Sequence, residues 1–139
     1  MHTALHEVLG HASGQLEDGV NTDMLKQYAS PLEESRADLF ALYYLMDPKL
    51  VELGLAESDE VGKAAYDQYL RNGLMLQLRR IEPGKDIQQA HMRNRQMVSK
   101  WVFEKGQAQG ADEMVTRYGY SFINNKDYEK LRTIFGYQL

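Results

Sequence analysis

Cysteine is absent from the 139-residue sequence. Disulfide bridges and cysteine-ligated metal sites are therefore excluded, and histidine, aspartate and glutamate remain as the strong metal ligands that the chain offers. The absence of disulfides fits a cytoplasmic protein, which is the location we expect.

The sequence also lacks an excess of positive charge and a long apolar run. Its 16 lysines and arginines are outnumbered by 20 aspartates and glutamates, and the net charge is −4. Because the basic residues are scattered among acidic ones, we expect no nucleic-acid partner. No apolar run approaches the roughly 20 residues of a membrane helix, and no signal peptide opens the chain, so we expect no membrane partner.

With 43% apolar residues, the chain is suited to one domain with a real core. Apolar periodicity, caps and turn residues favour a mainly α fold, in which residues 1–139 form a single helical subdomain. A short extended segment is expected near the C-terminus, at 117–123, after a loop at 106–113. The expected helices span about 3–15, 30–47, 58–81, 86–105 and 125–135.

The clearest helix signal is SPLEESRADLFALYYLMDP. Ser30 is the predicted N-cap, Pro31 takes the first helical position, and Glu33 completes a capping box. Asp47 and the proline after it would end this helix. A similar pair, Asp86 and Gln89, predicts a cap for the helix at 86–105, whereas Gly73 weakens the middle of the helix at 58–81.

The stretch HEVLGH places His6 and His11 five residues apart. On a straight α-helix this spacing amounts to roughly 140°, so the two side chains would diverge. The H-E-x-x-H pattern of zinc peptidases has its histidines four apart and therefore on one face. A one-residue bulge with a π-type turn at Gly10 would return His11 to the face of His6, and glycine resists such a distortion least.

A third metal ligand is expected from a second helix, because a hydrolytic zinc ion usually takes three protein ligands. EESRAD offers Glu33, Glu34 and Asp38. Glu34 and Asp38 are four apart and share a face, whereas Glu33 is assigned to the capping box, so we choose Glu34 as the ligand. Asp38 would accept the second ring N–H of a zinc-bound histidine. Glu33 is also expected next to the metal ligands without binding the metal itself.

Each motif has a plainer interpretation. HEVLGH alone fits a solvated polar face, and EESRAD alone fits a capped helix start with acidic residues at the positive end of the helix dipole. His2 and His6 have the ideal spacing of four, but Thr3 follows His2 where the catalytic pattern has glutamate. The two motifs together are much more specific than either one.

HEVLGH followed by EESRAD resembles the paired signature of the dipeptidyl peptidase III family of zinc metallopeptidases. GKDIQQAHMRNRQ is similar to a downstream segment of the same family, in which a histidine and an arginine four residues later face the substrate. Here these residues are His91 and Arg95. The resemblance therefore implies an exopeptidase that removes dipeptides from the N-terminus of short peptides.

The resemblance also implies roles for individual residues. His6, His11 and Glu34 correspond to the Zn²⁺ ligands, and Glu7 to the residue that polarises the attacking water. On general chemical grounds, Glu7 would take a proton from that water and deliver it toward the leaving amine. His91 lies one helical turn before the arginine, so one face could present both residues to the oxyanion or to the substrate backbone.

In this family the zinc lobe faces another lobe across a cleft. We therefore expect the chain to be a piece of a larger peptidase, with weak activity or none by itself, because orientation of the substrate depends on both lobes. Some bacterial relatives join the peptidase region to a Nudix-type domain. The alternative hypothesis is a non-catalytic helical interaction module, from a parent protein of this Nudix-containing kind, that keeps the motif and self-associates through exposed apolar surface.

Overall fold

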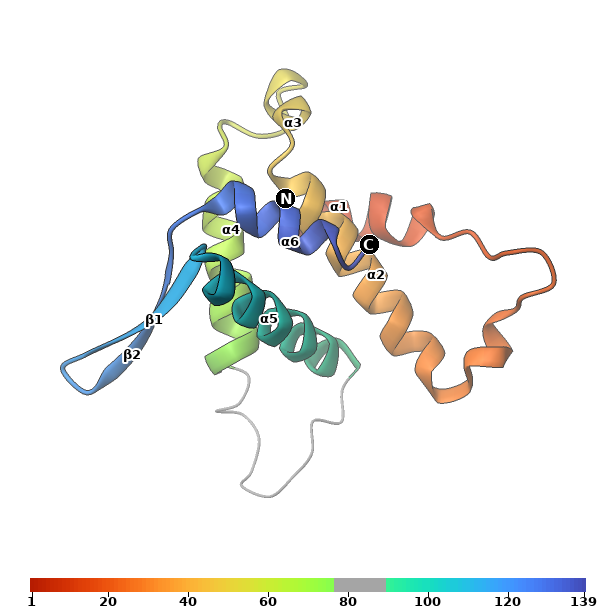
Figure 1. Cartoon of the computed structure of the whole chain (residues 1–139). Coiled ribbons are helices and arrows are strands. Elements are labelled where there is room, and N and C mark those ends of the chain that lie inside the picture. Colours follow the sequence, from red (N-terminus) through yellow and green to blue (C-terminus); the bar gives the residue numbers. More distant parts are fainter. Residues whose placement is uncertain (77–89) are drawn as a thin grey trace.

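The computed structural model describes residues 1–76 and 90–139 and confirms a mainly α fold with one short hairpin (Figure 1). The chain begins with α1 (His2–Leu5), the π-helical turn η1 (His6–Gly10) and the 3₁₀ turns η2 (His11–Ser13) and η3 (Thr22–Tyr28). The main helices are α2 (Ala29–Leu45), the short α3 (Pro48–Glu52), α4 (Glu60–Arg71) with the π turn η4 (Asn72–Leu76), and α5 (Ala90–Gln109). The chain ends with β1 (Asp112–Arg117), β2 (Tyr120–Asn125) and α6 (Tyr128–Gly136).

Helix α2 is the element on which the others pack. It contacts α1, η1, α4, α5 and α6, and Figure 1 shows it beside α5 and behind α6. Its buried residues lie on more than one face, as expected for a helix with neighbours on several sides. EESRAD and many of the buried core residues are both part of α2. The helix at the centre of the packing therefore also contains the candidate metal ligand.

The helices around α2 each contribute one apolar face. In α4 and α6 the buried residues recur at intervals of three and four, which is the period of an amphipathic helix. Among the described residues, no helix is both long enough and apolar enough to cross a membrane. The largest fully buried apolar side chains are Leu42, Tyr66, Leu70, Val98, Val102, Leu131, Ile134 and Phe135.

The expected capping box at the start of α2 is wrong. The helix begins at Ala29, before Ser30, and has no side-chain cap. Pro31 still lies in the first turn, where its missing N–H leaves no hydrogen bond unmade. The Glu33 carboxylate does not bond the start of the helix. It accepts hydrogen bonds from Arg36 instead. At the other end, Asp47 follows α2 and caps α3 by accepting the N–H of Lys49.

Gly73 has a packing role that its helix propensity does not show. The structure ends α4 at Arg71 and continues in η4, where a Cβ on Gly73 would lie only 2.6 Å from the carbonyl oxygen of Arg95. The turn therefore lies directly on the backbone of α5, which only glycine allows. The remainder of the helix predicted to reach residue 81 and the cap predicted at Asp86 and Gln89 lie outside the described residues.

The extended segment expected near the C-terminus is part of a two-stranded antiparallel hairpin. Tyr118 and Gly119 form its turn with positive φ at both positions, the conformation of a type I′ turn. The predicted loop at 106–113 is wrong at both ends, because α5 continues to Gln109 and β1 begins at Asp112. The last helix is confirmed, and the Asp127 side chain caps it by accepting the N–H of Lys130.

Asp112, the first residue of the hairpin, is a buried carboxylate. It is 3% exposed and packs against Gly106 of α5, and within the described part of the chain neither carboxylate oxygen has a hydrogen-bond partner. Burial raises the pKa of Asp112 to about 7. The folded protein therefore favours the protonated carboxyl group.

We expect the free energy of unfolding to fall between about pH 4 and pH 7, because the unfolded chain releases the Asp112 proton in this range and the folded chain keeps it. Asp112→Asn should remove this dependence and make the protein up to about 4 kcal/mol more stable than wild type at pH 8. Urea unfolding from pH 4 to pH 8 measures it. The exposed Asp23→Asn control should keep the wild-type slope, and an equally steep slope in Asp112→Asn would contradict the expectation.

Candidate metal centre

The π turn η1 brings His6 and His11 to the same side of their helix. The backbone N–H of His11 donates to the carbonyl of His6, five residues earlier, in place of the usual α-helical partner. The two rings lie with their centroids 4.8 Å apart and nearly perpendicular, at 87°. The structure thus contains the deformation that the five-residue spacing predicts.

Gly10 allows this turn to lie directly on α2. A Cβ at Gly10 would be 2.7 Å from the Cα and from the carbonyl oxygen of Ala37, so no other residue fits without a backbone shift. Ala37 lies one turn after Glu34 on α2. The close approach therefore places both histidines within reach of the Glu34 carboxylate.

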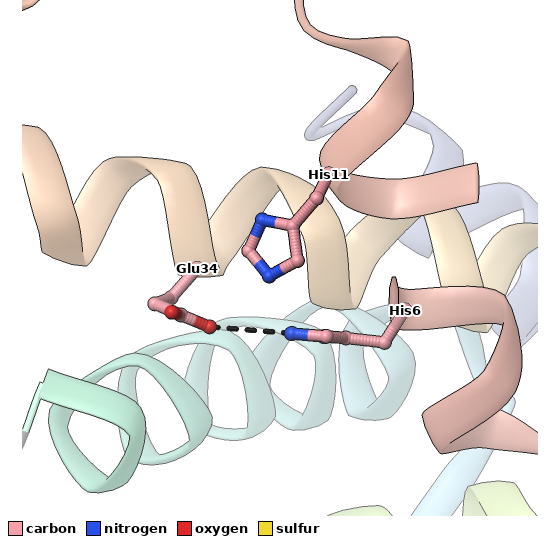
Figure 2. A group of neighbouring side chains, drawn as sticks. All are labelled: His6, His11 and Glu34. Carbon is pink, nitrogen blue, oxygen red and sulfur yellow. Dashed lines mark ion pairs between the residues drawn. The ribbon is translucent and has the colours of Figure 1, made fainter. Parts of the chain in front are cut away.

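His6, His11 and Glu34 form a group that could hold a metal ion. One ligand atom from each residue lies within 4.8 Å of the others, and Nε2 of His6 is 3.3 Å from Oε2 of Glu34. Figure 2 shows the His11 ring above this pair, with one nitrogen directed toward the gap between them. Ligands of a tetrahedral zinc ion lie about 3.3 Å apart, and the distance between Nε2 of His6 and Oε2 of Glu34 matches this spacing.

The Glu34 carboxylate itself fits a metal ligand. Its Oε2 is buried and, among the described residues, has no hydrogen bond of good geometry, although imidazole nitrogens of His6 and His91 lie 3.3 and 3.1 Å away. An unsatisfied buried carboxylate oxygen is costly, and a cation bound between it and the imidazoles would remove this cost. Two nitrogens and one oxygen are a donor set that zinc accepts.

A carboxylate stands behind each histidine. The Nδ1 atom of His6 lies 2.8 Å from Asp38, and Nδ1 of His11 lies 3.0 Å from Glu33. Each contact fixes its ring and leaves Nε2 for a metal. The hydrogen bond that His11 donates to the Glu33 carboxylate raises the pKa of His11, so a proton competes with the metal for this ring.

Asp38 belongs to a buried polar cluster that the sequence patterns do not reveal. Its Oδ2 accepts hydrogen bonds from the Tyr69 hydroxyl at 3.0 Å and from Nδ2 of Asn94 at 2.8 Å. Nε2 of His2 lies 3.7 Å from Oδ1, and burial lowers the pKa of His2, which favours its neutral form. Asp38 is thereby held in the orientation in which it faces His6.

The three predicted catalytic residues, His91, Arg95 and Glu7, differ in their exposure and in their position relative to the ligand group. His91 is 68% exposed, and its Nδ1 lies 3.1 Å from Glu34, so it stands at the solvent edge of the group. Arg95 lies farther inside, with its guanidinium 5.3 Å from the centre of the Tyr69 ring. Glu7 is exposed on η1, directly after His6.

The chain matches the model of a known protein family. The model of a family described as peptidase family M49 matches residues 17–118, which is well over half of the chain. The matched region contains α2 with Glu33, Glu34 and Asp38, and it also contains His91 and Arg95 on α5. It does not contain HEVLGH. No curated protein matches the sequence.

We expect Gly10→Ala to lower the free energy of unfolding by about 1–3 kcal/mol, because the added methyl group overlaps the α2 backbone. It should also weaken zinc binding, since η1 must move away from Glu34. Urea unfolding and zinc titration measure the two effects. Leu9→Ala, at an exposed neighbour on the same turn, is the control. A Gly10→Ala protein that matches this control in both measurements would show that the close approach is unimportant.

Proposed function

The chain belongs to peptidase family M49, and we propose that it is the zinc-binding catalytic subdomain of a dipeptidyl peptidase III-like metallopeptidase that releases N-terminal dipeptides from short peptides. The observation that carries this proposal is the convergence of His6 from η1, His11 from η2 and Glu34 from α2. The family match alone supports a peptidase. The ligand group supports a metal-dependent one.

His6, His11 and Glu34 would hold the zinc ion. When bound, zinc supplies Lewis acidity toward a water molecule and a peptide carbonyl. Asp38 and Glu33 keep the two imidazoles oriented, as their contacts with the Nδ1 atoms indicate. The exposure of His11 and His91 leaves one side of the group open to a substrate.

Glu7 is the proposed general base. It follows His6 on η1 and is exposed, so its carboxylate is free to take a proton from the attacking water and pass it to the leaving amine. His91 lies at the solvent edge of the site and would donate a hydrogen bond to the substrate carbonyl or to the oxyanion that forms from it.

Arg95 is the proposed cationic partner of His91 on α5. Its guanidinium lies over the Tyr69 ring, so it would have to leave this ring to contact a peptide directly. From its present position it adds positive charge behind the cluster of Asp38 and Tyr69. The proposal further includes a second lobe of the same parent protein as the opposite wall of the cleft, and a cytoplasmic location.

The rival proposal is a non-catalytic interaction module. It is favoured by the exposed aromatic side chains of the hairpin, of which Tyr118 is 98% and Tyr120 is 70% exposed. Such a surface fits self-association. No comparison supports a link to a Nudix hydrolase.

The ligand assignment is tested by zinc analysis of purified variants. We expect the wild-type chain to bind one zinc ion and His11→Ala to lose stoichiometric binding, because one of three ligands is removed. Glu7→Gln and His91→Ala should both retain the metal and control for general loss of fold. Stoichiometric zinc in His11→Ala would show that the assignment is wrong.

The catalytic assignment is tested with the protein in which these residues occur together with the second lobe. We expect dipeptide release from a peptide with a free N-terminus and none from its acetylated form. Glu7→Gln should lower kcat about 10²- to 10⁴-fold with unchanged zinc content, because a general base is lost. A zinc-loaded protein without any dipeptide release would favour the interaction module.

A further inference from the structure

We propose that Arg36 is a positioning residue of the metal centre, which joins the end of the π turn to Glu33 and thereby fixes the ring of His11. The inference rests on the proposed function, which assigns the metal ligands but gives Arg36 no part. It concerns the arginine of EESRAD, whose side chain reaches the backbone at the end of HEVLGH.

The first part of the argument concerns backbone carbonyls. A helix end leaves carbonyl groups without helical donors, and the change from the π turn η1 to the 3₁₀ turn η2 creates such an end next to His11. Nη1 of Arg36 donates to the carbonyl of Gly10 at 2.9 Å, and Nη2 donates to that of His11 at 3.4 Å. The Ser13 hydroxyl, 2.5 Å from Nη1, donates to the same Gly10 carbonyl. Arg36 thus fixes the backbone that carries His11.

The second part concerns the carboxylate behind His11. Nη2 and Nε of Arg36 bind the two oxygens of Glu33, at 2.6 and 3.2 Å. The same Oε1 atom faces Nδ1 of His11 at 3.0 Å. A planar guanidinium can bind both carboxylate oxygens and the carbonyls at once, whereas the ammonium group of lysine acts as a single point charge. Arg36 therefore fixes the backbone of His11 directly and its Nδ1 atom through Glu33.

The third part is the unequal burial of the two histidines. The His6 side chain is 9% exposed and is held by Asp38, which is itself buried under Tyr69 and Asn94. The His11 side chain is 33% exposed, and its partner Glu33 is 43% exposed. Packing holds the first ring, but little packing holds the second. His11 consequently depends on Arg36 more than His6 depends on any single residue.

Gly14 provides an independent way to disturb this arrangement. A Cβ at Gly14 would lie 2.5 Å from Nη2 of Arg36, while its φ of −70° and ψ of 121° are open to alanine. Gly14→Ala should therefore displace the guanidinium without removing its charge or straining the backbone. If Arg36 positions His11, this variant and Arg36→Lys should act in the same direction.

Arg132 is a matched control. It also joins a backbone carbonyl, that of Tyr43, to a carboxylate, that of Asp47, with both contacts at 3.0 Å, and it is 20% exposed compared with 28% for Arg36. It links α6 to the end of α2, away from the ligand group. Arg132→Lys should therefore lower stability without altering the metal centre.

The experiment compares wild type, Arg36→Lys, Gly14→Ala and Arg132→Lys. Zinc affinity is measured by chelator competition, ligand geometry by the visible spectrum of the Co²⁺-loaded protein, and folding by circular dichroism and thermal unfolding. In the metal-free protein, ¹⁵N NMR follows the ring tautomer of His11. We expect Arg36→Lys to weaken zinc binding about 10- to 100-fold and to alter the cobalt spectrum. Gly14→Ala should do the same to a smaller extent, and Arg132→Lys should bind zinc as wild type does.

The outcomes separate the inference from the proposed function. If wild type binds zinc and Arg36→Lys binds it equally tightly with the same cobalt spectrum, the inference is overturned and the proposed function stands. An equal loss of affinity in Arg132→Lys also overturns it, because the effect would then be one of general stability. If wild type binds no zinc, the ligand assignment fails. The His11 tautomer then decides: a single tautomer in wild type that is lost in Arg36→Lys supports the inference, and identical spectra overturn it. If Arg36→Lys does not fold, the Gly14→Ala measurements decide in the same way.

Discussion

The contact between Gly10 and the backbone of Ala37 is the constraint on which the rest of the centre depends. Two helical segments can come this close only where one of them has no side chain, and glycine is the residue type without one. The same glycine lies in the π turn that brings His11 to the side of His6. One residue therefore sets both the direction of the two imidazoles and their distance from the Glu34 carboxylate on α2.

Around this contact, buried and half-buried charges are placed in pairs. Asp38 is stabilised by donors from η1, α4 and α5, so the cost of removing its carboxylate from water is offset by several hydrogen bonds. Glu33 has a corresponding set of partners nearer the surface. Glu34 differs from both, because its Oε2 lacks a well-formed hydrogen bond within the described residues. This difference distinguishes the candidate ligand from the two carboxylates that support the histidines.

Much of the fold follows from local patterns. The five-residue spacing in HEVLGH predicts a π turn because the period of a regular helix cannot place both histidines on one face. The pattern of residues 125–135 likewise predicts the last helix, which the structure places at Tyr128–Gly136. The start of α2 was not predictable in the same way, because Glu33 has a stronger partner in Arg36 than in the helix start. The extension of α5 through Gly106 was missed since a glycine tightly packed against Asp112 is read from sequence as a loop residue.

The sequence by itself determined the residue types, the spacing of His6 and His11, and the placement of Glu34 and Asp38 on one face of one helix. It also excluded cysteine from any metal site. Only the tertiary structure decided that Asn94 and Tyr69 meet at Asp38, that His91 reaches Glu34, and that Arg36 spans back to the Gly10 carbonyl. The physical reason is that spacing and hydrogen bonding within a segment are local properties. Which helix faces meet depends instead on how the whole core around α2 packs.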